Sequence, residues 1–364
     1  MLHKTVVARD PDELAGIVDL QVRLLQLAAH TNQIDKKALE HWFNDSDLVD
    51  YVTQNFSRVI GALKDFAREC PPADKGALIS EVIDEIEHDA NFWNRYGDPS
   101  FVLKFTGTGN PHRQHIATWL KGFYEQFSKS GFPFLSPTGS QPWNKHAWED
   151  AFREKNRGVQ VCPQCDGTMH NGVTVEHIFP RAKYPALSVH VANLIPCCEN
   201  CQREKANKDP IQVAPPRRLF LPYWQHALEH CDVKAIQDGS GGWKFALVPR
   251  APGADWQDAI TQMGHLYGIP DQWSQRINWI VDLAYAKIEE KLYADRDEEQ
   301  PVRSLTELQK RLDSLCANMK KQWGKQHYFV PTTAWLEWAK DNMLDQLWAQ
   351  FGEKNIAANG QTGM

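Results

Sequence analysis

Residues 162–201 read CPQCDGTMHNGVTVEHIFPRAKYPALSVHVANLIPCCENC, with a C-x2-C pair at each end. Cys162 and Cys165 form the first pair, and Cys198 and Cys201 form the second. Each pair makes a tight turn that presents two thiolates, so the two pairs together can hold a tetrahedral Zn²⁺ ion. Cys197 would need a C-x3-C spacing to take part, and we expect it to stand outside the group. Because four thiolates complete the coordination of the ion, the sequence predicts a structural zinc site.

The stretch between the two pairs is long for a plain zinc ribbon. It contains 32 residues, whereas ribbons usually have about 15 to 20. Within it and just beyond it, VTVEHIFP (173–180) predicts a strand, ANLIPCC (192–198) a second short strand, and ENCQREKANK (199–208) a helix. The sequence therefore predicts a small α+β unit in which the zinc ion fastens the first turn to the start of the helix. The alternative is a ribbon whose only role is to fold this segment.

Several residues of this stretch follow one another in a characteristic order. An acid–histidine pair, Glu176-His177, ends the first predicted strand, and Pro180 follows three residues later. Asn193 precedes the second strand, the second cysteine pair opens the helix, and Lys205 comes soon after it. In this order and spacing the segment resembles the HNH endonucleases, which have the ββα-metal fold. More narrowly, it looks like bacterial anti-phage HNH nucleases such as the nuclease of the Septu system, which works with an ATPase.

The resemblance assigns roles to individual side chains. It implies that His177 is the general base, that Asn193 holds and orients its imidazole by a hydrogen bond, and that Glu176 ligates a catalytic Mg²⁺ or Mn²⁺ ion. The family normally has His or Asn as a metal ligand directly after the last zinc cysteine, where this chain has Gln202. Either the longer amide side chain of Gln202 coordinates less rigidly, or Asn207, about a turn and a half further along the helix, replaces it.

The neighbouring positions of Glu176 and His177 set a geometric condition. Adjacent residues of a strand point to opposite faces of a sheet, so both can serve one site only if the strand bends there. Pro180, three residues on, favours an early end to the strand.

Positive charge is concentrated around the cysteine pairs. Residues 151–218 contain ten Lys and Arg against six Asp and Glu, a net charge of +4 in a chain whose net charge is -6. A basic island in an acidic protein indicates a local contact with a polyanion. The resemblance implies that four cations near the motif hold phosphate groups: Arg181, Lys183, Arg203 and Lys205. We therefore expect nucleic acid, with DNA first, as the substrate.

The flanking sequence predicts helical regions on both sides of a core at residues 144–215. We expect a helical region over residues 1–143, with a helix start at Asp10-Pro11-Asp12-Glu13 and helical patterns near 46–68 and 76–91. Residues 216–354 should be mainly helical, with a small hairpin at 232–249, one long apolar stripe from Trp273 to Ile288, and a capping box at Ser304–Glu307. Residues 355–364 have no apolar face to bury and are expected to be a disordered tail.

The composition narrows the class of protein. The chain of 364 residues has 42% hydrophobic residues and a mean hydropathy of -0.53, and no apolar run reaches the ~18 residues of a membrane span. The first residues lack a signal-peptide pattern, so we expect a cytoplasmic location with reduced cysteines. The sequence-based hypothesis is a mainly α protein with a zinc-stapled ββα-metal nuclease core: a metal-dependent HNH endonuclease, the effector of an anti-phage system with an ATPase partner. The alternative is a non-catalytic zinc module that binds nucleic acid or a partner protein.

Overall fold

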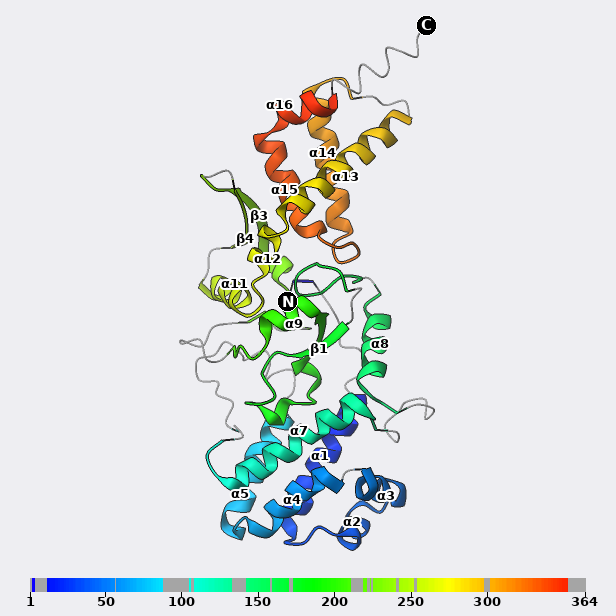
Figure 1. The fold of residues 1–364 in the computed structure, drawn as a ribbon, viewed down its shortest axis with the longest axis vertical. Helices are drawn as coiled ribbons and strands as arrows, with labels where there is room; N and C mark the ends of the chain where they lie inside the picture. The colour runs from blue at the N-terminus through cyan, green and yellow to red at the C-terminus, as the bar shows by residue number, and fades with distance from the viewer. Residues whose placement is uncertain are drawn as a thin grey trace. The chain divides into compact units, whose positions relative to one another are not determined.

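The computed structural model describes residues 2–3, 12–55, 57–87, 105, 108–132, 142–157, 159–169, 173–210, 219–220, 223, 225–239, 242–251, 254–297 and 302–352. It forms two compact units, each assembled from separate stretches of the chain. The N-terminal unit comprises Thr5–Arg157 and Gly172–Trp224, and the C-terminal unit comprises Met1–Lys4, Gly158–Asn171 and Gln225–Met364. The protein is mainly helical with two small antiparallel sheets, one in each unit (Figure 1).

The N-terminal unit begins with a layer of amphipathic helices. They are α1 (Asp12–His30), α2 (Lys36–Phe43), α3 (Ser46–Asn55), α4 (Ser57–Glu69), α5 (Pro72–Ile86), α7 (Pro111–Lys129) and α8 (Lys145–Lys155). Local capping fixes several of their starts, since Asp35, Asn110 and Asn144 each accept a hydrogen bond from a backbone N–H of the first turn. The pattern at 46–68 forms two helices, α3 and α4, and not one. Asp10 and Pro11 of the expected first helix start lie outside the described residues.

The predicted strand, loop, strand and helix are present in this unit. β1 (Val173–His177) pairs antiparallel with β2 (Leu194–Cys198), with His177 opposite Leu194, and α9 (Glu199–Lys205) follows directly. Two short turns of 3-10 helix, η2 (Pro185–Leu187) and η3 (Val191–Asn193), form the loop between the strands. Val175 of β1 and Leu194 of β2 belong to the same hydrophobic core as the helices of this unit. The small sheet is therefore built onto that helical layer.

The C-terminal unit contains the predicted hairpin. After α10 (Ala227–His230), β3 (Cys231–Gln237) pairs antiparallel with β4 (Trp243–Pro249). The remaining elements are α11 (Ala254–Tyr267), α12 (Ile269–Ser274), α13 (Ile277–Asp297), α14 (Leu305–Lys321), α15 (Phe329–Asn342), α16 (Leu344–Leu347) and a π-helical turn, η4 (Trp348–Gly352). The N-cap half of the expected capping box is present, because Ser304 Oγ accepts from the backbone N–H of Glu307 at 3.2 Å, while the Glu307 carboxylate accepts from the N–H of Arg303, one residue before the cap.

The apolar stripe from Trp273 to Ile288 spans two helices, α12 and α13, because α12 ends at Ser274. The expected tail at 355–364 lies outside the described residues. Among the helices of the described ranges, none combines the length and the apolar character needed to cross a membrane.

Candidate functional site

Four cysteine side chains form one compact group. The sulfur atoms of Cys162, Cys165, Cys198 and Cys201 lie within 4.8 Å of one another, and all four residues are buried. A Zn²⁺ ion with tetrahedral bonds of about 2.3 Å to sulfur places its ligand atoms about 3.8 Å apart. The group therefore has the composition and dimensions of a zinc site, while Cys197 of β2 stands outside it, as predicted.

Hydrogen bonds within the C-terminal unit hold the first cysteine pair. Asp166, directly after Cys165, has a left-handed backbone with φ 62° and a fully buried side chain. Its carboxylate accepts hydrogen bonds from Val330 N at 2.8 Å and from His3 Nε2 at 2.6 Å. Trp273 Nε1 donates to the carbonyl oxygen of Cys165 at 2.9 Å. The turn that carries two of the thiolates is thus fixed by residues that the motif does not include.

His177 lies at the end of β1 with one side of its ring tied to the protein. Its Nε2 lies 2.9 Å from the carbonyl oxygen of Ser188, and since a carbonyl only accepts, Nε2 must carry the hydrogen. Within the described residues the opposite nitrogen, Nδ1, makes no hydrogen bond, so Nδ1 is the basic atom. Burial lowers the pKa of His177 to about 4, and the hydrogen bond to Ser188 opposes this effect. The imidazole is therefore neutral at pH 7, the form that a general base requires.

The expected hydrogen bond from Asn193 to the imidazole does not occur in this structure. The fully buried side chain of Asn193 instead ties the loop together: Oδ1 accepts from Phe179 N at 2.7 Å, and Nδ2 donates to the carbonyls of Phe179 at 3.1 Å and Leu187 at 2.9 Å. Both amide hydrogens are used by these carbonyls, so none remains for His177. Asn193 acts one step away, because Leu187 directly precedes Ser188, whose carbonyl holds the ring.

Glu176 and Lys205 are both buried, and their charges act on each other. Burial raises the pKa of Glu176 to about 7, while the Lys205 ammonium and the backbone N–H of His177 oppose the rise. Lys205 is 0% exposed, and its Nζ has no hydrogen-bond partner in the described part of the chain. Burial also lowers the pKa of Lys205, against the opposing charge of Glu176. Lys205 was expected to hold phosphate, but its side chain is fully buried, and its charge acts on both Glu176 and His177.

Glu176 and His177 are consecutive paired residues of β1, opposite Ile195 and Leu194, and the strand has no bend between them. β1 ends at His177, and the N–H of Ile178 donates to the carbonyl of Asn193 at 3.1 Å. Both side chains of the pair are buried, and the charge of Lys205 acts on both. Because adjacent residues of a paired strand point to opposite faces, the strand alone does not bring the two side chains into one site, and their joint action belongs to the proposal below.

The other expected phosphate ligands differ in their surroundings. The Arg181 guanidinium is half-buried and lies 4.7 Å from the centre of the Tyr124 ring. Lys183 forms an ion pair with Asp209 at 2.5 Å, which engages much of its charge. Arg203 is exposed and donates to a neighbouring side-chain amide on α9. Arg181 is the cation of this group that lies beside the histidine, since its charge also acts on the pKa of His177.

The two candidate amide ligands of a catalytic ion lie at different depths. Gln202 is half-buried in α9, and Asn207 is exposed just beyond the end of that helix. Among the described residues, the four cysteines are the one group of three or more His, Cys, Asp or Glu side chains close enough to share an ion. A second ion at Glu176 would therefore need amide and water oxygens as its remaining ligands, which suits Mg²⁺.

Several residues around His177 come from the preceding helices α7 and α8, and the sequence motif does not predict them. The Tyr124 ring of α7 meets the imidazole edge to face, with ring centres 4.4 Å apart and an angle of 69°. Burial raises the pKa of Tyr124 to about 12, so its hydroxyl is neutral. The charges of Lys145 and Glu149 on α8 also reach this region, acting on His177 and Tyr124 respectively. No spacing rule in the sequence connects these helices to the motif.

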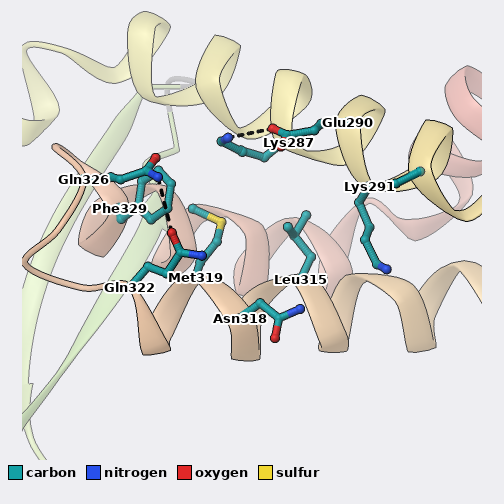
Figure 2. Close-up of a pocket in the computed structure, with 10 residues that line it drawn as sticks. Lys287, Glu290, Lys291, Leu315, Asn318, Met319, Gln322, Gln326 and Phe329 are labelled. Carbon is teal, nitrogen blue, oxygen red and sulfur yellow. Dashed lines mark hydrogen bonds and ion pairs between the residues drawn. The ribbon is translucent and has the colours of Figure 1, made fainter.

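The C-terminal unit contains two hollows whose linings differ from the residues at the end of β1. A groove of about 250 Å³ runs between α13 and α14, with Leu315, Met319 and Phe329 on its floor. Figure 2 shows Lys287 of α13 paired with Glu290 at 2.6 Å along its edge. A second hollow of about 280 Å³ is lined by residues of β3, α14 and α15. Neither has histidine in its lining, so the end of β1 remains the candidate for acid–base chemistry.

Comparisons with known proteins add no relative. A scan against protein-family models gives no match, and searches of curated proteins and of solved structures give none either. The functional assignment therefore depends on the residues of the site and on the motif.

Proposed function

We propose that this protein is a metal-dependent HNH-type endonuclease that hydrolyses phosphodiester bonds of nucleic acid, with DNA as the expected substrate. The observation that carries the proposal is His177: a neutral imidazole at the end of β1, held through Nε2, with Nδ1 available and Glu176 beside it. Two antiparallel strands followed by a helix support the proposal, because this is the order of elements in the ββα-metal fold, and the four-cysteine group includes the start of that helix.

In the proposed reaction, different residues of the site have different roles. His177 Nδ1 takes a proton from a water molecule, whose oxygen attacks phosphorus as the bond from phosphorus to the leaving oxygen breaks. Arg181 binds a non-bridging oxygen and balances charge on the phosphate. A bound phosphodiester carries negative charge, which raises the pKa of His177 from about 4 towards neutrality and strengthens it as a base. Glu176 with Gln202 or Asn207 would hold a divalent ion, which when bound neutralises charge on the phosphate and the leaving oxygen.

Four thiolates leave no open position on the zinc ion, so the zinc has a structural role in this proposal. The narrower proposal is that the protein is the effector of a bacterial anti-phage system and works with an ATPase. The likeness of its motif to the Septu nuclease supports this. Assays of the chain alone and with any ATPase encoded beside its gene test that requirement.

A nicking assay tests the main proposal. Purified protein is incubated with supercoiled plasmid, single-stranded DNA or RNA, in Mg²⁺ or Mn²⁺ and in a buffer free of both, and zinc content is measured in each sample. Metal-dependent cleavage by wild type, with bound zinc unchanged, is the expected result. Nucleic-acid binding without cleavage in any divalent ion would favour the alternative, a non-catalytic zinc module.

The choice between Gln202 and Asn207 is tested by metal titration. If the Gln202 amide ligates the ion, Gln202→Ala raises the Mg²⁺ concentration needed for half-maximal activity, and Gln202→Asn or Gln202→His restores it. If Asn207 is the ligand, Asn207→Ala shows the defect and Gln202→Ala does not. Wild-type titrations from both alanine variants would leave Glu176 as the one protein ligand of the ion.

A further inference from the structure

The contacts that fix the His177 imidazole lead to one helix, α7, about 50 residues earlier in the sequence. Leu120 and Tyr124 lie four positions apart on α7, so they share a face of the helix. Both are buried in the N-terminal unit. Each is connected to His177 by a different kind of contact.

The first connection runs through Ser188. Its hydroxyl donates to the carbonyl oxygen of Leu120 at 3.0 Å, and its own carbonyl accepts from His177 Nε2 at 2.9 Å. Ser188 is 0% exposed, so water cannot replace either bond. Because the side chain and the carbonyl belong to one residue, the bond to α7 sets the position of the atom that selects the imidazole tautomer.

The second connection is the Tyr124 ring. It meets the imidazole at an angle of 69° with ring centres 4.4 Å apart, and the Arg181 guanidinium also packs against it, 4.7 Å from the ring centre. The ring thus contacts the proposed base and the proposed phosphate ligand. A smaller side chain would leave space into which both could turn.

We infer that Tyr124 and Ser188 are positioning residues for His177, and that α7 belongs to the catalytic site as a rigid support of its base. The reaction that this support serves is the nuclease activity proposed above, and the inference rests on that proposal. The positioning itself is a property of His177 that can be measured without any substrate.

The experiment compares Tyr124→Leu with Tyr124→Phe, which keeps the ring and removes the hydroxyl. Phe123→Leu is the matched control, because it removes a fully buried ring of the same helix that packs against Trp119 and Phe132. Steady-state cleavage gives kcat and KM, and nitrogen-15 NMR of the histidine side chains reports the tautomer of His177. A His177→Gln sample identifies the signals.

Tyr124→Leu is expected to lower kcat by roughly 10- to 100-fold, the loss that follows small misplacement of a catalytic group, and to raise KM as well, because Arg181 loses the ring against which it packs. Its His177 signals should show mixed tautomers, where wild type shows Nε2–H alone. Tyr124→Phe should recover most of the lost kcat and the single tautomer, and Phe123→Leu should keep both.

Wild-type kcat and tautomer in Tyr124→Leu would overturn the inference. So would a loss in Tyr124→Phe equal to that in Tyr124→Leu, since the hydroxyl would then be the active part. If no sample cleaves nucleic acid, the proposed function fails, and the NMR measurement still decides whether α7 fixes the ring. Ser188→Ala, which removes the bond to Leu120, should mix the tautomers in the same way.

Discussion

Asn193→Ala is expected to loosen the loop between β1 and β2 and to disturb His177 without removing any group that touches it. The substitution deletes three hydrogen bonds of a fully buried side chain, one from Phe179 N and two to the carbonyls of Phe179 and Leu187. It leaves the bond from His177 to Ser188 formally intact. If Asn193 held the imidazole directly, Asn193→Ala would disturb His177 and leave the loop as it is. If Asn193 ties the loop together, the substitution loosens the loop between β1 and β2 first and His177 as a result.

The size of the effect follows from the bonds. A buried backbone N–H that loses its acceptor costs about 2 kcal/mol, and each neutral hydrogen bond lost to a carbonyl costs about 0.5 to 1 kcal/mol. The total for Asn193→Ala is about 3 to 4 kcal/mol, which corresponds to a several-hundred-fold increase in local opening at roughly 1.4 kcal/mol per factor of ten. Part of this opening would move Ser188 and with it the imidazole.

Hydrogen–deuterium exchange measured by mass spectrometry is the assay, since it reports opening of one segment in a protein with two units. Peptides covering residues 178–193 should exchange at least 100-fold faster in Asn193→Ala than in wild type, and cleavage should fall with them. Asn110→Ala is the control: it removes one N-cap bond, at 2.9 Å from Arg113 N, and costs about 1 kcal/mol at the start of α7. Exchange of the loop within threefold of wild type in Asn193→Ala would refute the clamp.

Three further substitutions test the rest of the site. His177→Ala should keep its zinc and its fold but lose at least the ~10²-fold in cleavage rate that a general base contributes; near-normal nicking by the folded variant would remove His177 from the mechanism. Cys165→Ser or Cys201→Ser should lose zinc and unfold the segment locally, since structural zinc contributes roughly 10 kcal/mol or more; elemental analysis finding no zinc in wild type purified without chelator would contradict this. Lys205→Met removes the positive charge that lowers the pKa of Glu176, so this pKa should rise above about 7. Because Glu176 must ionise to bind a cation, the acidic limb of the pH–rate profile should move to higher pH, and an unchanged limb would show that the two groups are not coupled.

The parts of this site that could be predicted from sequence depend on short-range spacing. The C-x2-C pairs each lie within one turn, so the two thiolates of a pair converge locally. That both pairs join in one group was expected from the chemistry of zinc, which takes four thiolates, and not from spacing. Alternating apolar residues likewise predicted the β3–β4 hairpin. The burial of Lys205 was predictable from the same kind of evidence, because it lies four residues after Cys201 on α9 and shares its inward face.

The roles of Asn193 and α7 could not be predicted in this way. The partners of Asn193 depend on how the 16 residues between β1 and β2 pass through two 3-10 turns, and the motif gives only its position in the order. Tyr124 contacts His177 across more than 50 residues of sequence. Its place in the apolar pattern of α7 is that of an ordinary core residue. Only the packing of the helix against the loop distinguishes it from its neighbours.

The support of the first cysteine pair has a consequence for how the protein is made. The Asp166 carboxylate bonds His3, 163 residues before it in the sequence, and Val330, 164 residues after it. The carbonyl of Cys165 bonds Trp273, which lies 108 residues later. At a synthesis rate of about 5 to 20 residues per second, Val330 leaves the ribosome roughly 8 to 33 seconds after Asp166. During that interval the Asp166 carboxylate can bond His3, which is already synthesised, and lacks its second partner, Val330. A chain that ends within α13 therefore carries the first cysteine pair without the last hydrogen bond of its support, which comes only with the start of α15 (Phe329–Asn342).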